Sequence, residues 1–216
     1  KYSKLYSTFI ERPKTLLVGD RLHTSYYIPG TVTGRISSSG PNLQNEPKDV
    51  RCIFIPEDGC VFVQLDYKQA EFRMWAFYSQ DPQMLEDIRS GNDIHKIIAS
   101  VVYGVPESEV ALYQRLVAKG VVFGLMYGRG IESLMLEFKC SEDTASNIIQ
   151  TFFSRYPKAK QWLLDTQKQA RRNGYVKNLF GRIRRLPKIK GYDKEEIAEA
   201  ERQAVNSPIQ GGVADL

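Results

Sequence analysis

RLVAKGVVFGLMYG, residues 115–128, places Arg115, Lys119, Phe123 and Tyr127 at every fourth position of a helix-length stretch. At about 100° per residue, four-residue steps drift by only about 40° each, so the first three side chains share a narrow face and Tyr127 lies about 120° from Arg115. That face carries two cations followed by two aromatic rings. A helix that only packed or only faced solvent would not combine them, so the pattern fits an anionic ligand with a flat ring.

The composition is that of a soluble globular protein, with 42% hydrophobic and 25% charged residues among 216. A net charge of +5 and a pI near 9.0 mildly favour polyanionic partners. Three widely spaced cysteines with no CxxC pair indicate neither a disulfide framework nor a zinc site. We therefore expect a reducing compartment, cytoplasmic or organellar, and no secretion. No apolar run approaches the ~20 residues of a membrane span, so no membrane partner is expected.

Local patterns divide the chain. Residues 1–60 show no helical period, and TGRISSSGPNLQNEP at 33–47 predicts a long ordered loop between short strands. CVFVQLDY at 60–67 predicts a buried strand that ends in Asp66. Helical patterning dominates from about 69 to 170. Residues 177–187 indicate a hairpin or basic loop, and 194–210 a charged helix.

Capping residues mark two of the expected helices. Asn92 or Asp93 can cap a helix that ends at Gly104, and Ser141 can cap another that begins with two acids. A further helical pattern is only beginning where the sequence stops, so we expect the chain to be part of something longer.

DYKQAEFR, residues 66–73, combines Asp66, Glu71 and Arg73. A carboxylate at the end of a rigid strand is a good Mg²⁺ ligand, because Mg²⁺ prefers hard oxygens. Taken alone, Asp66 fits a helix cap better, and the other two fit a solvated helix face. Taken alone, His95 would be a surface histidine or one whose hydrogen bonds are satisfied within the fold. Arg115 and Lys119 would form a solvated basic face, and Phe123 and Tyr127 would be core residues.

The order of these segments resembles the motif series of the family A DNA polymerases. The resemblance runs from about residue 5 to residue 216 and covers five segments in order: TGRISSSGPNLQNEP, DYKQAEFR, DIH, RLVAKGVVFGLMYG and ERQAVNSPIQG. It implies a mixed α/β (α+β) fold, a partial right-hand polymerase with palm and helical fingers. Residues 1–73 would be the first part of the palm with the end of the thumb connection, 74–196 the fingers, and 197–216 a return to the palm.

The resemblance implies a DNA-templated DNA polymerase that transfers deoxynucleoside monophosphates from dNTPs to a primer 3′-hydroxyl. Asp66 would be one of two carboxylates that hold a Mg²⁺ pair, with the main-chain carbonyl of Tyr67 as an extra ligand. The other carboxylate belongs to a His-Asp-Glu turn that this sequence does not contain. We therefore expect the 216 residues alone to be inactive.

The resemblance also assigns the nucleotide contacts. Arg115, Lys119 and His95 would meet the phosphates, and Lys119 would also help to protonate the leaving pyrophosphate. Phe123 would lie against the sugar and base, and Tyr127 beside the templating base, with Gln69 as a further contact. Glu71 resembles a steric gate that excludes the ribose 2′-hydroxyl. Other matched positions would face the primer terminus or the minor groove of the DNA: Arg35, Asn42, Gln44, Arg73, Arg202, Asn206 and Gln210.

Two rival functions stay open at this point. A single-subunit RNA polymerase of related fold would need the space that Glu71 fills. A non-catalytic nucleic-acid-binding module would not need Asp66, Arg115 and Lys119 together. Lys68 departs from the family pattern and has no assigned role. Proofreading or 5′-nuclease domains, replication or repair roles, processivity factors and the biological source are equally undecided.

Overall fold

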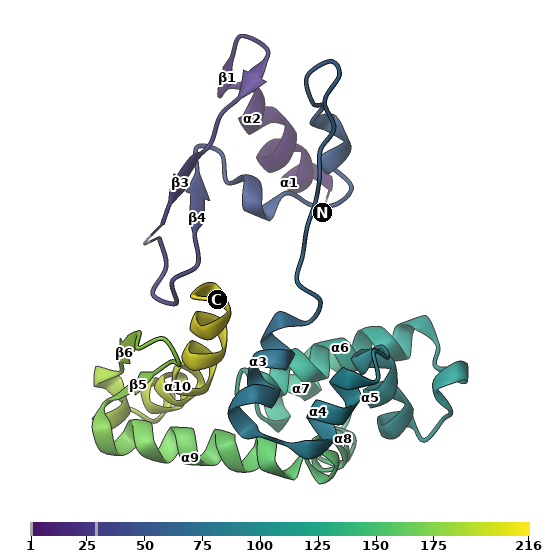
Figure 1. Ribbon diagram of the computed structural model, residues 1–216, viewed down its shortest axis with the longest axis vertical. Helices are drawn as coiled ribbons and strands as arrows, with labels where there is room; N and C mark the ends of the chain where they lie inside the picture. Colours follow the sequence, from purple (N-terminus) through teal and green to yellow (C-terminus); the bar gives the residue numbers. More distant parts are fainter. Residues whose placement is uncertain (1, 29) are drawn as a thin grey trace. The chain divides into compact units, whose positions relative to one another are not determined.

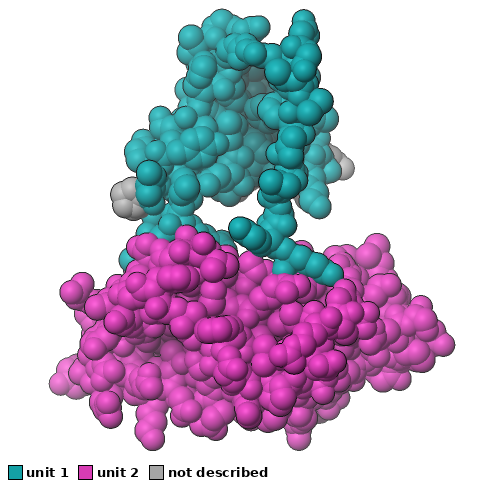
Figure 2. Space-filling view, in the orientation of Figure 1, with its two compact units in different colours: residues 1–68 teal, residues 69–216 magenta. Residues whose placement is uncertain are grey.

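The structure is a computed structural model that describes residues 2–28 and 30–216. The chain forms two compact units, unit 1 (residues 1–68) and unit 2 (residues 69–216) (Figure 2). The division falls between Lys68 and Gln69. The boundaries predicted for palm and fingers stay predictions, because compactness alone does not assign these names.

Unit 1 consists of short elements and long connections (Figure 1). Two antiparallel pairs, β1 with β2 and β3 with β4, confirm the expectation of short strands around the Gly- and Ser-rich stretch. Residues 2–14 are helical, which the sequence did not indicate. The elements are α1 (Tyr2–Tyr6), the π-helical turn η1 (Ser7–Glu11), α2 (Arg12–Lys14), β1 (Leu17–Val18), β2 (Arg21–Leu22), β3 (Ser25–Tyr27), β4 (Ser37–Ser39) and the 3₁₀ turns η2 (Leu43–Asn45) and η3 (Arg51–Ile53).

The predicted buried strand at 60–67 is wrong in this structure. These residues adopt no regular secondary structure, and Val61 and Leu65 are 80% and 91% exposed. A strand is stabilised by ladder hydrogen bonds and by burial of its side chains, and both require a neighbouring strand or helix. Among the described residues no strand pairs with this segment. Asp66 is therefore exposed on an extended segment instead of at the end of a buried strand.

Unit 2 is helical, with one hairpin inserted before its last helix (Figure 1). The helices expected between 69 and 170, the hairpin and the charged helix are all confirmed. No described helix is both long and apolar enough to cross a membrane. The elements are α3 (Ala70–Ser79), α4 (Pro82–Arg89), α5 (Ile94–Tyr103), the 3₁₀ turn η4 (Glu107–Glu109), α6 (Leu112–Met126), α7 (Ile131–Phe138), α8 (Glu142–Arg155), α9 (Pro157–Asn173), β5 (Tyr175–Lys177), β6 (Ile183–Arg185), the 3₁₀ turn η5 (Pro187–Lys190) and α10 (Lys194–Ala214).

Capping explains where the helices begin and end. Asp93 caps α5 by accepting from the backbone N–H groups of His95 and Lys96, and Gly104 ends it with φ +65°. Ser141 caps α8 by accepting from the N–H of Thr144. Both caps confirm the sequence expectation, with Asp93 chosen over Asn92.

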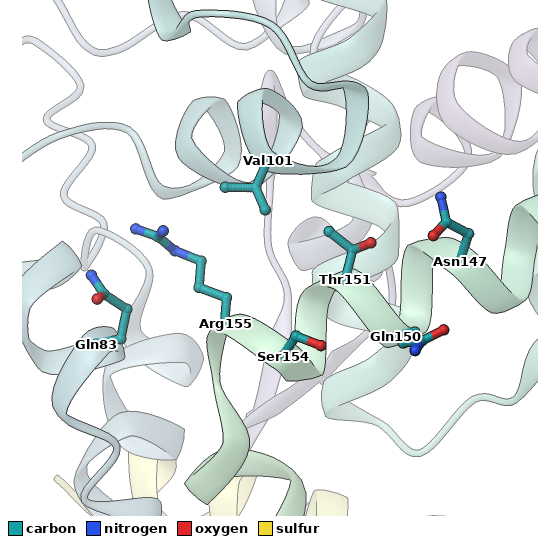
Figure 3. A pocket seen from close by; sticks show the side chains of 7 residues that line it. All are labelled: Gln83, Val101, Asn147, Gln150, Thr151, Ser154 and Arg155. Carbon is teal, nitrogen blue, oxygen red and sulfur yellow. The ribbon is translucent and has the colours of Figure 1, made fainter.

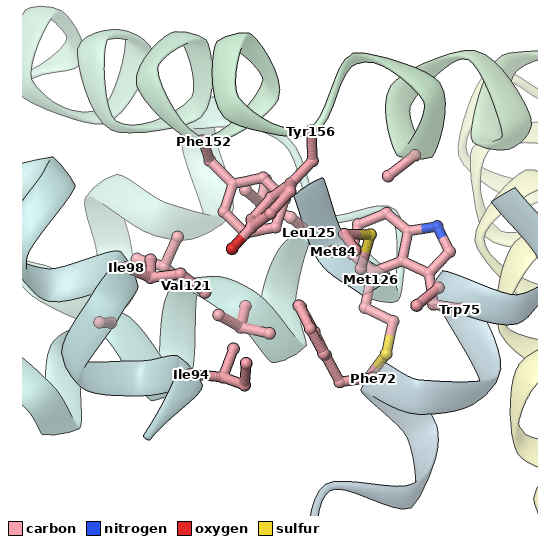
Figure 4. Close-up of a cluster of buried hydrophobic side chains, with 14 of the residues drawn as sticks. Phe72, Trp75, Met84, Ile94, Ile98, Val121, Leu125, Met126, Phe152 and Tyr156 are labelled. Atoms are coloured by element: carbon pink, nitrogen blue, oxygen red, sulfur yellow. The ribbon is translucent and has the colours of Figure 1, made fainter. Parts of the chain in front are cut away.

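The core of unit 2 is an apolar cluster to which every α-helix from α3 to α10 contributes, and Figure 4 shows part of it. Trp75 is fully buried and stacks on Phe152 with ring centroids 5.9 Å apart. Phe72 and Tyr156 meet edge to face at 6.1 Å. Because the same cluster includes Ile94 of α5 and Val121 of α6, the core fixes α3 against the helices that carry the site described below.

Buried carboxylates tie the helices together. Asp81 caps α4 and also accepts from the N–H of Lys158, so one side chain serves the starts of two helices. Asp87 accepts from Tyr156 Oη at 2.6 Å and from Arg155 Nη2 at 2.7 Å. Arg155 also borders a polar pocket on this side of unit 2, lined by Gln83, Val101, Asn147, Gln150, Thr151 and Ser154 (Figure 3). Because the guanidinium is engaged by Asp87, this pocket offers no unpaired cation.

Candidate active site

The face predicted on residues 115–128 forms on α6. Lys119 Nζ lies 6.0 Å from the centre of the Phe123 ring, and the Phe123 ring lies 6.1 Å from that of Tyr127. Lys119 is exposed, whereas Phe123 and Tyr127 are half-buried. The side chains thus run in a row from solvent into the edge of the core, as the helical spacing predicts.

α5 brings His95 to this row. Its ring centroid is 6.2 Å from that of Phe123, and its side chain is buried with Nδ1 lacking a hydrogen-bond partner among the described residues. Burial lowers the pKa of His95 to about 4. The negative charge of Asp93 raises this pKa, but the positive charges of Arg115 and Lys119 lower it further. His95 is therefore uncharged at neutral pH, so it can meet an anion as a hydrogen-bond donor but not as a cation.

Arg115 is held by the residue that caps α5. Its Nε donates to Asp93 Oδ2 at 2.6 Å, and both side chains are about one-third exposed. Burial opposes ionisation of Asp93, but the hydrogen bond and charge of Arg115, together with the two capped N–H groups, outweigh it and lower the pKa of Asp93. The sequence predicted Asp93 only as a cap. Its ion pair with Arg115 could not be predicted, because the two residues are 22 positions apart and lie on different helices.

The double role of Asp93 gives a stability prediction. Asp93→Ala removes a cap and an ion pair, and we expect it to lower the free energy of unfolding by about 1–3 kcal/mol at pH 7. Asp93→Asn keeps a capping oxygen and should cost about 1 kcal/mol or less. Because the folded-state pKa is lowered, this stabilisation is present above the unfolded-state pKa and is lost as the pH falls through the folded value.

Denaturant unfolding of the three proteins between neutral and acid pH measures these differences. Equal stability of wild type and Asp93→Ala at pH 7 would show that neither interaction contributes.

Glu71 on α3 meets the other end of the row. Its side chain is buried, and one of its carboxylate oxygens accepts a hydrogen bond from Tyr127 Oη. The contact joins residues that are 56 positions apart. The structure therefore brings together His95, Arg115, Lys119, Phe123, Tyr127 and Glu71, all predicted to contact a nucleotide. Gln69, predicted with them, precedes α3 with φ +56°.

A cleft of about 1390 Å³ continues from Tyr127 between α6, α7, α8, α9 and α10. Arg202 and Asn206, both predicted to contact DNA, line it, and Asn206 Oδ1 is buried without a partner in the described part of the chain. Gly128 has φ +71°, and a Cβ there would lie 3.2 Å from Val205, so a glycine lets α6 end against α10. Arg129 and Gln203 also line the cleft and were not predicted; Gln203 directly follows Arg202, and Arg129 lies two positions after Tyr127.

The remaining predicted DNA contacts are dispersed. Arg73 is exposed on α3, and Gln210 is half-buried on α10. In unit 1 Arg35 is exposed in the loop between β3 and β4. Asn42 caps η2 and accepts from Ser38 Oγ at 2.8 Å, and Gln44 Nε2 donates to the carbonyl of Ile36 at 3.1 Å. These amides shape the loop, and their contacts with DNA stay predictions.

Asp66 and Tyr67, the predicted metal ligands, are exposed in unit 1. The carboxylate and the main-chain carbonyl are oxygen donors of the type that Mg²⁺ prefers. Residues 2–28 and 30–216 contain no group of three or more His, Cys, Asp or Glu side chains arranged to hold a metal ion. The donor type therefore fits Mg²⁺, and the roles of Asp66 and Tyr67 as metal ligands stay predictions.

Comparison with known proteins decides what this arrangement belongs to. The model of DNA polymerase family A matches residues 1–216. The chain belongs to DNA polymerase family A. DNA polymerase I of Caldicellulosiruptor bescii is 39% identical over 223 residues, which cover 100% of this chain and 26% of that protein. The thermostable DNA polymerase I of Thermus aquaticus is 39% identical over 226 residues, covering 99% and 27%.

A solved polymerase structure has the same fold. The polymerase domain of Pol1 from M. smegmatis, in complex with a DNA primer-template and dNTP, matches with a TM-score of 0.91 and 33% identity. The match covers 99% of this chain and 39% of that one. The predicted fold class, a mixed α/β (α+β) fold that forms part of a right-hand polymerase with palm and helical fingers, is confirmed. The chain spans about a quarter of the length of the curated relatives it matches.

Proposed function

We propose that this chain is the fingers and part of the palm of a DNA-templated DNA polymerase, which transfers deoxynucleoside monophosphates from dNTPs to a primer 3′-hydroxyl. The observation that carries the proposal is the row on α6, where two cations precede two rings, together with the buried carboxylate of Glu71 on α3 at the end of the row. A dNTP has the complementary order of groups: a triphosphate, a sugar without a 2′-hydroxyl and a flat base. Membership of family A and the solved relative's complex with primer-template and dNTP support the same assignment.

Each side chain of the row has a distinct task. Arg115 and Lys119 bind the β- and γ-phosphates, and Lys119, the exposed cation, also donates a proton toward the leaving pyrophosphate. Phe123 orients the sugar and base, and Tyr127 flanks the templating base. Arg115 must share its guanidinium between Asp93 and the phosphates, since Nε already donates to Asp93 and the terminal nitrogens are the remaining donors.

The metal chemistry is proposed in part. Asp66 and the carbonyl of Tyr67 would contribute oxygen ligands to Mg²⁺, which when bound supplies charge neutralisation at the attacking and leaving oxygens. A second carboxylate would be needed for a two-metal site. The purified 216-residue chain should therefore not extend primers.

Hydrogen-bond donors on the side chains of α10 and α3 would contact the minor groove of the DNA and so distinguish correctly paired bases from mispairs by their geometry. Minor-groove acceptors are nearly independent of sequence, so Arg202, Asn206, Gln210 and Arg73 can contact every correct pair alike. A copying enzyme needs this tolerance. A cytoplasmic or organellar location, where template and dNTPs are available, stays a prediction.

The proposal is tested by primer extension with the complete polymerase containing residues 1–216. We expect templated incorporation of the complementary dNTP and poor use of NTPs. Efficient RNA synthesis would favour the RNA polymerase alternative, and binding of primer-template without any extension would favour the non-catalytic module.

Glu71 gives a specific prediction about the sugar. Its carboxylate is fixed by Tyr127, so it can block a 2′-hydroxyl by position. Glu71→Ala should raise the ratio of ribonucleotide to deoxyribonucleotide incorporation by about 10-fold or more, and lower the deoxyribonucleotide rate. Glu86→Ala, which removes an exposed acid from α4, is the control. An unchanged ratio would refute the steric gate.

Phe123 gives a prediction about the 3′-hydroxyl. A phenyl ring offers no hydrogen-bonding group to replace the hydroxyl missing from a dideoxynucleotide, so strong rejection of dideoxynucleotides is expected. Phe123→Tyr adds a hydroxyl that can hydrogen-bond to a charged group, which would reduce discrimination by roughly 10- to 150-fold. The measurement is the ratio of dideoxy- to deoxynucleotide incorporation by both proteins. Equal ratios would assign Phe123 to packing.

A further inference from the structure

A basic segment of unit 2 is not used by the site above. Residues 174–191 contain six Lys or Arg and no Asp or Glu. Three of the six are engaged: Arg182 pairs with Asp215, Lys188 pairs with Glu196, and Arg184 donates to Gln203. Within residues 2–28 and 30–216, Lys177, Arg185 and Lys190 have no acidic partner. These three cations are therefore available to an anion from outside the chain.

The pairing of β5 with β6 places cations and apolar groups on one face. Tyr175 is opposite Arg185, and Lys177 is opposite Ile183. Alternate residues of a strand point to the same side, so these four share the outer face, whereas Val176 is buried on the other side. Tyr175 and Ile183 are 42% and 48% exposed.

The face extends beyond both strands. At one end Lys190 Nζ lies 4.0 Å from the position that a Cβ on Gly174 would occupy, next to Tyr175. At the other end Lys177 Cε lies 3.6 Å from the corresponding position on Gly181, beside Phe180, which is 53% exposed. Exposed cations and apolar side chains therefore lie on the outer face of the strands and near both ends of the hairpin.

The turn that presents Phe180 is fixed. Asn178 Oδ1 accepts from the N–H groups of Phe180 and Arg182 at 3.1 and 2.9 Å, and its Nδ2 donates to Asp215 at 2.7 Å. Tyr78 Oη accepts from the N–H of Leu179 at 3.0 Å. The hairpin is thus tied to α3 and to the end of α10, so a ligand would meet a surface that is already ordered.

We propose that the outer face of the β5–β6 hairpin, formed by Tyr175, Lys177, Phe180, Ile183, Arg185 and Lys190, binds single-stranded nucleic acid. Its cations suit successive phosphates, and its exposed rings suit unstacked bases, the combination that single-strand-binding surfaces use. An acidic peptide would satisfy the cations but not the rings. In Figure 1 the hairpin lies beside α10, at the opposite end of unit 2 from α5 and α6, so this surface is separate from the α6 row.

The test measures fluorescence anisotropy of a labelled oligothymidylate of about 20 nucleotides with the 216-residue chain over a range of salt concentrations. The triple variant Lys177→Ala/Arg185→Ala/Lys190→Ala should bind about 10-fold or more weakly and reduce the slope of log K against log[salt] by about 2, since each phosphate contact contributes roughly 0.7. The control triple Lys48→Ala/Lys96→Ala/Lys158→Ala removes the same charge from exposed sites elsewhere. It should change affinity much less.

A second arm tests the rings. Phe180→Ala and Tyr175→Ala should each weaken binding at an unchanged salt slope, because stacking releases no counterions. Equal affinity of the two triple variants would overturn the proposal. Unchanged affinity of both ring variants, or tighter binding of poly-glutamate than of the oligonucleotide, would overturn it in favour of an acidic protein partner. None of these outcomes depends on polymerase activity, so the inference and the proposed function can fail separately.

Discussion

Asp66→Asn is expected to abolish primer extension by the complete polymerase containing residues 1–216, while its affinity for primer-template DNA changes by less than about threefold. The substitution keeps the size of the side chain and removes the charged oxygen that a divalent cation requires. Affinity for DNA rests mainly on contacts between cations and phosphates, which the change does not touch. Because Asp66 is exposed, loss of folding is not the expected cause of inactivity.

Asp58→Asn is the matched control, since it removes another exposed acid of unit 1 eight positions away. Single-turnover extension and equilibrium DNA binding are measured for both variants. Full turnover by Asp66→Asn, or lost DNA binding with intact turnover, would contradict the role assigned to Asp66.

Lys119→Ala is expected to lower the single-turnover extension rate at saturating dNTP by about 10²-fold or more, because it removes charge stabilisation and a proton donor at the leaving pyrophosphate. Lys119 also lies 6.0 Å from the Phe123 ring, so part of the effect could come from lost packing. Lys119→Met separates the two contributions, since it keeps an unbranched apolar chain without the charge.

Lys168→Ala, on the exposed side of α9, controls for the loss of a positive charge. We expect the Ala and Met variants of Lys119 to be similarly slow and the control to match wild type. A Met variant with the wild-type rate would assign Lys119 to packing.

Local chemistry explains which parts of the fold the sequence predicts. The caps of α5 and α8 and the basic hairpin were predicted because their stabilising hydrogen bonds lie within a few residues. The segment 60–67 was predicted as a strand from its apolar β-formers alone. Strand formation depends on distant partners, so the same composition leaves this segment extended and exposed here.

The site divides in the same way. The α6 row follows from helical geometry, and the position of each side chain on it could be predicted. The partners that fix the row come from far along the chain: Asp93 is 22 residues from Arg115, and Glu71 is 56 residues from Tyr127. Periodicity carries no information about such contacts, because they depend on how α3, α5 and α6 pack. The low pKa of His95 was also hidden, since it results from burial.

The central claim is that the α6 row receives the incoming nucleotide. The most direct test is an experimental structure of the complete polymerase with a dideoxy-terminated primer-template and the matching dNTP. We predict that the β- and γ-phosphates contact Arg115 and Lys119, and that the sugar lies against Phe123 and beside Glu71. A triphosphate bound elsewhere, with the α6 row still occupied only by its own side chains, would contradict this account.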